Sequence, residues 1–251
     1  MSRKHRRKRA RDNAEFLRRH EVYLLTQKGR NRFRRGQLEE GERIFRKVLE
    51  IDPLNRAALS GLGEIFLRRK DFRGAAEALE KLISVHPAGE RTLYNLAAAY
   101  RGLQRRDKAW KTLDRLVERN PDHLQGLTRL GDAFLERKDY GRAIELYRRA
   151  LDRSGDNIFA LRGIGMAYRG RKMYREAIDA WERLLRITPR DHRVLVRMGD
   201  ALLREGKRSQ AQRAYRLALE IVPGNAYALL GMASLDGGSG SASGGRRSVQ
   251  P

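Results

Sequence analysis

Proline, the residue that interrupts helices most strongly, recurs in this chain at intervals of 34 residues. Five of the six prolines lie on one 34-residue grid, and the grid position without proline holds Gly155. Two further series keep the same interval. The leucines are Leu25, Leu59, Leu93, Leu127, Leu161, Leu195 and Leu229, and the small residues are Gly29, Gly63, Ala97, Gly131, Gly165, Gly199 and Ala233. Three series in one register predict a chain of repeated structural units.

Each period has the pattern of two helices joined by a turn. In the second period, Leu59, Leu62 and Phe66 follow one another at three- and four-residue steps, as one face of a helix requires. A polar turn follows, and Ala75 and Leu79 then resume the same spacing. The proline grid ends each pair and starts the next. The sequence therefore predicts an all-α fold built from helical hairpins.

The residues within a period resemble the tetratricopeptide repeat. The fifth period carries the matching residues Leu161, Ile164, Gly165, Tyr168, Ala177, Trp181, Leu184 and Pro189. The resemblance implies an α-solenoid, a right-handed superhelix of about six 34-residue units followed by a half-repeat helix. The expected repeats are 22–55, 56–89, 90–123, 124–157, 158–191 and 192–225, with a capping helix at 226–236.

The two ends of the chain differ in composition from the repeats. We expect residues 1–13 to be a basic, disordered arm, because seven cations there repel one another and have almost no apolar surface to bury. Asp12 or Asn13 is the expected start of a helix that runs on to Arg35. The solenoid would then span 14–236, and the Gly/Ser-rich residues 237–251 would form a flexible tail.

The expected last helix is not very polar for the end of a repeat stack. Tyr227, Leu230 and Leu235 would be partly uncovered there. Uncovered apolar residues favour association, so we expect that two copies can join end to end through this helix.

Charge is the second strong feature of the composition. The chain has 55 Lys and Arg residues against 31 Asp and Glu residues, a formal net charge of +24. Such a field attracts nucleic acid, acidic proteins or an anionic membrane surface. Arginine outnumbers lysine 44 to 11, however, and a GC-rich genome would produce the same bias without selection for binding.

No catalytic or metal-binding pattern stands out. The chain has no cysteine, and its five histidines occur at unrelated repeat positions, so we expect neither a metal site nor a cofactor. The pairs Gly61/Gly63 and Gly163/Gly165 fall inside expected helices and lack the third glycine of a dinucleotide loop. No run is long and apolar enough to cross a membrane, and no secretory signal is found. We predict a non-enzymatic, cytoplasmic protein.

The resemblance also implies where a partner would bind. In this family the first helix of each pair lines the concave side of the superhelix, and its positions 2, 5, 9, 12 and 13 face the partner. The positions carry Tyr23, Arg30, Phe33, Arg34, Arg68, Arg91, Tyr94, Arg101, Phe159, Arg162, Arg169, Arg193, Arg204 and Tyr227. Glu64, Asp132, Glu136 and Asp200 oppose them. Arginines with aromatic rings suit an extended acidic peptide. The simpler interpretation is that these are ordinary solvated helix positions.

The alternative is a nucleic-acid-binding or ribosome-associated protein. Its basis is the basic arm, which consists of Arg3, Lys4, Arg6, Arg7, Lys8, Arg9 and Arg11. These side chains would contact phosphates without reading a base sequence. Adhesion to anionic lipid has only Phe16 and Leu17 in its favour.

Overall fold

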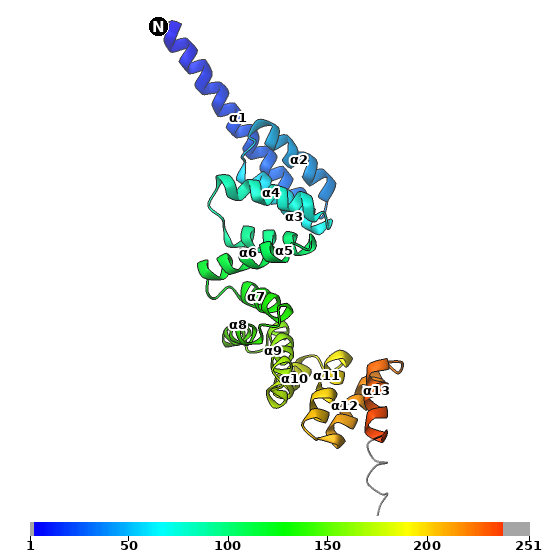
Figure 1. Cartoon of the computed structure of the whole chain (residues 1–251). Coiled ribbons are helices and arrows are strands. Elements are labelled where there is room, and N and C mark those ends of the chain that lie inside the picture. The colour runs from blue at the N-terminus through cyan, green and yellow to red at the C-terminus, as the bar shows by residue number, and fades with distance from the viewer. Residues whose placement is uncertain (1–2, 238–251) are drawn as a thin grey trace, which may run out of the picture. The chain divides into compact units, whose positions relative to one another are not determined.

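Helical hairpins follow one another along the chain (Figure 1). The structure is a computed structural model that describes residues 3–237, and in that range it contains thirteen α-helices and no strand. The helices are α1 (Arg3–Arg34), α2 (Leu38–Ile51), α3 (Arg56–Arg68), α4 (Phe72–Val85), α5 (Glu90–Gly102), α6 (Arg106–Arg119), α7 (Leu124–Glu136), α8 (Tyr140–Arg153), α9 (Ile158–Gly170), α10 (Tyr174–Ile187), α11 (His192–Arg204), α12 (Arg208–Ile221) and α13 (Ala226–Gly237). The predicted all-α architecture is confirmed.

The 34-residue period sets where the helices begin. We call the odd-numbered helices A helices and the even-numbered ones B helices. The A helices from α3 to α13 start at residues 56, 90, 124, 158, 192 and 226. Polar side chains cap several of these starts. The Asn55 side-chain oxygen, for example, accepts hydrogen bonds from the amides of Ala57 and Ala58, both at 3.1 Å. Proline two residues before the cap prevents the preceding B helix from continuing.

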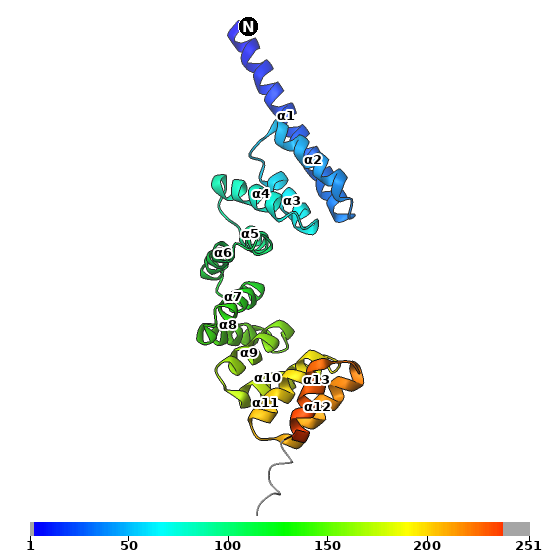
Figure 2. The same ribbon diagram turned by 45° about the vertical axis from the view of Figure 1, so that its right-hand side comes forward.

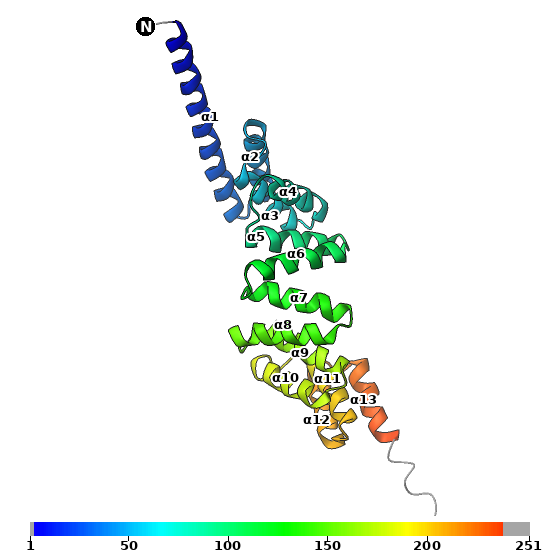
Figure 3. The same ribbon diagram turned by 60° about the vertical axis from the view of Figure 1, so that its left-hand side comes forward.

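The chain forms two compact units, Met1–Pro121 and Asp122–Pro251. The first unit contains α1 to α6, and the second contains α7 to α13. In the first unit the A helices α1, α3 and α5 pack on one another in sequence, and α2 and α4 each pack between two neighbouring A helices. In the second unit α8, α10 and α12 pack between neighbouring A helices in the same way. Figure 2 and Figure 3 show the hairpins of each unit stacked in this order.

Large B-helix side chains hold successive repeats together by lying against glycines of the A helices. The buried Tyr147 ring of α8 contacts Gly131 of its own repeat and Gly163 of the next one. A Cβ atom added to Gly131 would lie 2.8 Å from the ring, and one added to Gly163 would lie closer still. The same arrangement recurs with Phe45 between Gly29 and Gly61, and with Tyr215 between Gly199 and Gly231. Glycine is required here because no side chain fits between helix and ring.

Helix α1 is longer than the first repeat. It begins at Arg3, so the expected boundary at residue 13 is not marked by a break in secondary structure. Arginine, lysine and alanine are good helix formers, and extending an existing helix adds one hydrogen bond per residue without a new nucleation step. The expected flexible tail falls, from residue 238 onward, outside the described residues.

We predict that Gly163→Ala destabilises the second unit. The new methyl group would push against the Tyr147 ring, and overpacking of this kind costs about 1–3 kcal/mol. Urea unfolding followed by circular dichroism measures the loss. Gly141→Ala is the matched control, because a Cβ there would meet only a carboxylate oxygen of Asp139 at 3.8 Å. That variant should gain up to about 1 kcal/mol from helix propensity. Equal effects of the two substitutions would contradict this account.

Candidate partner-binding face of the A helices

In the first unit the structure brings several of the expected partner-binding residues together. The Arg68 guanidinium of α3 lies over the Phe33 ring of α1, 4.3 Å from its centroid. Arg91 of α5 pairs with Glu64 of α3 at 2.7 Å. These contacts join side chains of three successive A helices on one face. The A-helix face of this unit is therefore a continuous surface, with arginine as its main charged residue.

A hollow of about 540 Å³ lies between α1 and the start of α3. It includes two expected residues, Tyr23 and Arg30. Three more lining residues stand at partner-facing positions of the family but were not among the expected contacts: Thr26, Ala57 and Ser60. The other lining residues stand outside those positions and are Arg19, Val22, Gln27, Asn55 and Arg56. Thr26 is only 7% exposed, and its hydroxyl oxygen has no hydrogen-bond partner among the described residues. A polar, basic hollow with an unsatisfied hydroxyl can accept a small anionic group.

In the second unit the arginines gather around α9 and α11. Arg162 of α9 pairs with Asp191, the N-cap of α11, at 2.9 Å. Arg197 of α11 is partly buried. Burial is the largest cause that lowers the pKa of Arg197, and the positive charge of Arg169 is the second largest. Arg162 and Arg193 lower the Arg197 pKa further, whereas Asp191 raises it. Arg197 was missed among the expected site residues, although it completes this cluster of four arginines.

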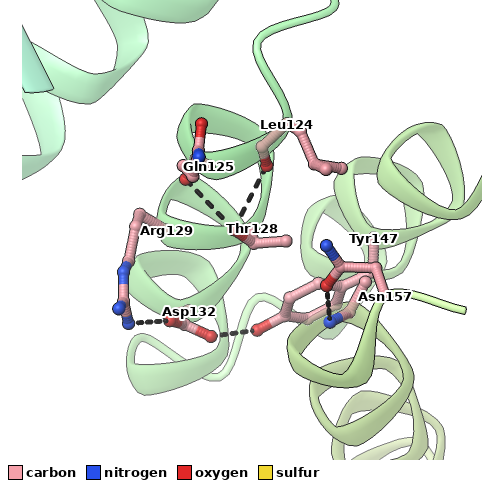
Figure 4. A network of polar contacts seen from close by, with 8 residues as sticks. Leu124, Gln125, Thr128, Arg129, Asp132, Tyr147 and Asn157 are labelled. Atoms are coloured by element: carbon pink, nitrogen blue, oxygen red, sulfur yellow. Dashed lines mark hydrogen bonds and ion pairs between the residues drawn. The ribbon is translucent and has the colours of Figure 1, made fainter. Parts of the chain in front are cut away.

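The acidic residues of the A-helix face are already engaged inside the protein. The Tyr147 hydroxyl donates a 2.7 Å hydrogen bond to Asp132, which also pairs with Arg129 at 3.2 Å. Figure 4 shows this network at α7 and α8. The Tyr215 hydroxyl bonds Asp200 in the same way, at 2.8 Å. Three of the four opposing acids, Glu64, Asp132 and Asp200, therefore have partners of their own, and the face offers mainly its cations.

The remaining expected residues differ in exposure. Tyr23, Phe159 and Tyr227 are exposed by 59%, 54% and 76%, whereas Tyr94 and Arg169 are half-buried. The other arginines are exposed: Arg30, Arg34, Arg101, Arg193 and Arg204. At the end of the stack, Leu230 is exposed as expected, but Leu235 is buried, because α13 turns it towards the core. Self-association through this helix stays a prediction.

The arm can be placed only through its backbone. Residues 3–11 lie in α1, and Arg11 is exposed. The side chains of Arg3, Lys4, Arg6, Arg7, Lys8 and Arg9 lie outside what the structure describes. In the described part of the chain, no cluster of three potential metal ligands is found. No helix within that part is both long and apolar enough to cross a membrane.

The stacked hairpins define a helical-repeat protein. The chain matches the tetratricopeptide repeat over residues 26–90, 94–158 and 162–226, and it belongs to this family. Such repeats generally serve as protein-interaction modules, and members of this fold are typically non-catalytic. The resemblance seen in the sequence is confirmed.

Solved structures agree on the fold. PilF of Pseudomonas aeruginosa is 19% identical with a TM-score of 0.71, and the match covers 86% of this chain and 99% of that one. A tetratricopeptide repeat protein from Parabacteroides merdae is 21% identical (TM-score 0.66; 87% and 93% covered). MamA from Desulfovibrio magneticus is 18% identical (TM-score 0.64; 68% and 97% covered). No curated protein matches the chain.

We predict that Tyr147→Phe removes the stabilising hydrogen bond to Asp132 and, with it, a pH dependence of the free energy of unfolding. Loss of a hydrogen bond to a charged group costs about 1.5–3 kcal/mol. Burial, followed by the nearby Asp132 carboxylate, raises the Tyr147 pKa. The folded state therefore holds the phenol proton more tightly than the unfolded state, and this stabilisation is lost as pH rises above about 10.

The measurement is urea unfolding of both proteins at neutral pH and above pH 10. The stability difference between wild type and Tyr147→Phe should shrink at high pH, where the phenol ionises on unfolding. Lysine titration is common to both proteins and cancels in the difference. Tyr227→Phe, at an exposed position, is the control and should change neither stability nor its pH dependence. A difference that stays constant with pH would refute the assignment.

Proposed function

We propose that the protein is a scaffold whose A-helix faces bind an extended acidic segment of a protein partner. The observation that carries the proposal is that acidic side chains of this face are paired within the protein, while several of its arginines are exposed. Asp132, Asp200 and Glu64 are engaged with neighbouring side chains, whereas arginines such as Arg30 and Arg193 are exposed. A partner with carboxylates would therefore meet unbalanced guanidinium groups, which bind carboxylates in forked geometry.

Exposed aromatic rings beside the arginines add apolar contact area to the charge. Tyr23 lies at the hollow with Arg30, and Phe159 lies 5.9 Å from the guanidinium of Arg129. Aromatic and arginine side chains are the residues that most often dominate binding energy at interfaces. Each unit carries both types on its A helices, so each unit can bind part of an extended segment by itself.

The test is binding of labelled extended peptides that differ only in charge: a glutamate-containing peptide, its glutamine analogue and its lysine analogue. Arg30→Gln in the first unit and Arg193→Gln in the second should each weaken binding of the acidic peptide by about tenfold, which corresponds to about 1.4 kcal/mol. Fluorescence anisotropy gives the dissociation constants.

Arg43→Gln and Arg186→Gln are the matched controls. Both arginines are exposed on B helices, so the change in net charge is the same while the A-helix face is untouched. We expect affinities within about twofold of wild type for the controls. If the control variants lost as much affinity as Arg30→Gln and Arg193→Gln, only the overall charge would attract the peptide. Equal affinity for the glutamate, glutamine and lysine peptides would contradict the proposal.

A second candidate function is contact of the basic arm with nucleic-acid phosphates. The observation in its favour is that α1 continues back to Arg3, so the seven cations of the arm lie on the part of this helix that precedes the first repeat. A helix with this charge suits a phosphate backbone, to which each contact adds salt dependence.

We predict that removing residues 1–13 flattens the salt dependence of RNA binding. If the arm neutralises about six phosphates, the slope of log affinity against log salt should fall by about 4 for single-stranded RNA. Titration of a labelled mixed-sequence RNA between about 50 and 300 mM salt measures both slopes. The same slope for the full and shortened chains would exclude the arm as the phosphate-binding element.

A further inference from the structure

The two edges of each unit differ in charge. Within a unit the A helices run in the same direction, so every turn from an A helix to its B helix lies at one edge, and every linker from a B helix to the next A helix lies at the other. We call these the turn edge and the linker edge. The turn edge comprises 33–40, 67–74 and 101–108 in the first unit and 135–142, 169–176 and 203–210 in the second.

The turn edge carries much of the protein's excess charge. In each unit it contains ten Lys and Arg residues and four Asp and Glu residues, a net charge of +6. The linker edge is defined by windows of the same size, without the linker that joins the two units. It comprises 50–57 and 84–91, and then 152–159, 186–193 and 220–227, and its net charge is −1 in the first unit and 0 in the second.

General causes of positive charge do not explain this difference. Cations favour helix C-termini, but each edge contains C-termini and N-termini in alternation, so the helix dipole acts on both edges alike. A genomic preference for arginine would also enrich both edges equally. The difference in net charge between the two edges is therefore specific to the turn edge. It indicates that the turn edge is a surface that faces an anionic ligand.

Backbone conformation at the turns gives an independent indication. One residue in each of the six turns has a positive φ, and two of them are glycines, Gly36 and Gly206. At the same place in three other turns stand Lys70, Lys138 and Lys172, with φ of 61°, 60° and 61°. L side chains adopt this region rarely, and glycine adopts it freely. A cation is thus kept at the turn where glycine would fit better.

These three lysines are exposed, and none has a carboxylate within ion-pair distance in the described structure. Their charges are therefore available to a ligand. Packed helices lie about 8–10 Å apart, a distance close to the Debye length of about 8 Å at physiological salt. The fields of neighbouring turns consequently reinforce one another along the edge.

The distribution of apolar side chains decides what kind of partner fits. The structure's exposed large hydrophobic residues include Leu54, Val85, Phe159, Ile187 and Tyr227, which all lie at the linker edge. None of the exposed large hydrophobic residues of the described chain lies at the turn edge. A protein interface needs an apolar centre, whereas a phosphodiester backbone is bound chiefly by Lys and Arg. The turn edge, which is basic and has no exposed large apolar side chain among the described residues, fits a phosphodiester backbone.

We propose that the turn edge of each unit is a binding surface for the phosphodiester backbone of nucleic acid. It is distinct from the basic arm, which precedes the repeats, and it does not depend on peptide binding by the A-helix face. Contacts to phosphate carry no base sequence, so the surface would hold nucleic acid without sequence preference and with strong salt dependence.

The test replaces the three lysines by glycine in the full chain: Lys70→Gly, Lys138→Gly and Lys172→Gly together. Glycine removes three charges and suits the positive φ, so the variant should keep its helical circular dichroism and its thermal midpoint. Binding of a labelled mixed-sequence RNA should weaken by about tenfold or more near physiological salt. The slope of log affinity against log salt should fall by about 2 if all three lysines contact phosphate.

The control is Lys47→Gln, Lys81→Gln and Lys111→Gln, three exposed lysines within B helices. It removes the same charge and should leave the slope unchanged. An unchanged slope in the glycine variant, or the same reduction in both variants, would overturn the proposal. So would a variant that loses affinity for polyglutamate but not for RNA. Acidic-peptide binding should survive the lysine substitutions, which separates this surface from the A-helix face.

Discussion

Contact between a ring and two glycines joins each of three repeats to its successor. A ring such as Tyr147 fills space that the absence of a side chain leaves on two A helices, Gly131 in its own repeat and Gly163 in the next. The contact is short-ranged, so the repeats are coupled mainly to their nearest neighbours, as is usual for repeat proteins. The A helices are held in register by it, and their outward faces form a surface in each unit as a consequence.

The position that receives a ring in some repeats supplies a cation in others. Gly163 and Gly231 lie against tyrosines, while the equivalent positions of two other repeats hold Arg129 and Arg197. Arg129 pairs with Asp132 beside Phe159, and Arg197 lies within the arginine cluster of α9 and α11. The same position of the repeat is thus a packing site where it is glycine, and it carries a positive charge where it is arginine.

Much of the fold could be predicted from the sequence because its signals are local. The proline grid and the helical spacing predicted helical hairpins with a 34-residue period, and the A helices from α3 to α13 begin at intervals of 34 residues. The beginning of α1 could not be predicted, because charge repulsion argued for disorder while helix propensity argued for extension. The partners of Asp132 and Asp200 were also missed, since their tyrosines lie 15 residues away on another helix. Likewise, the Thr26 hydroxyl is recognised as unsatisfied only once its surroundings are known.

The ring and glycine contact also restricts how this chain can change in length. A single inserted residue in an A helix would rotate the helix by about 100° and move its glycine away from the ring. Insertion of a whole repeat does not change the register of the other repeats. Each B-helix ring therefore stays opposite the A-helix residue that it already contacts. Duplication and loss of complete 34-residue units are therefore the changes of length that the packing tolerates, while the turns can vary in charge without disturbing it.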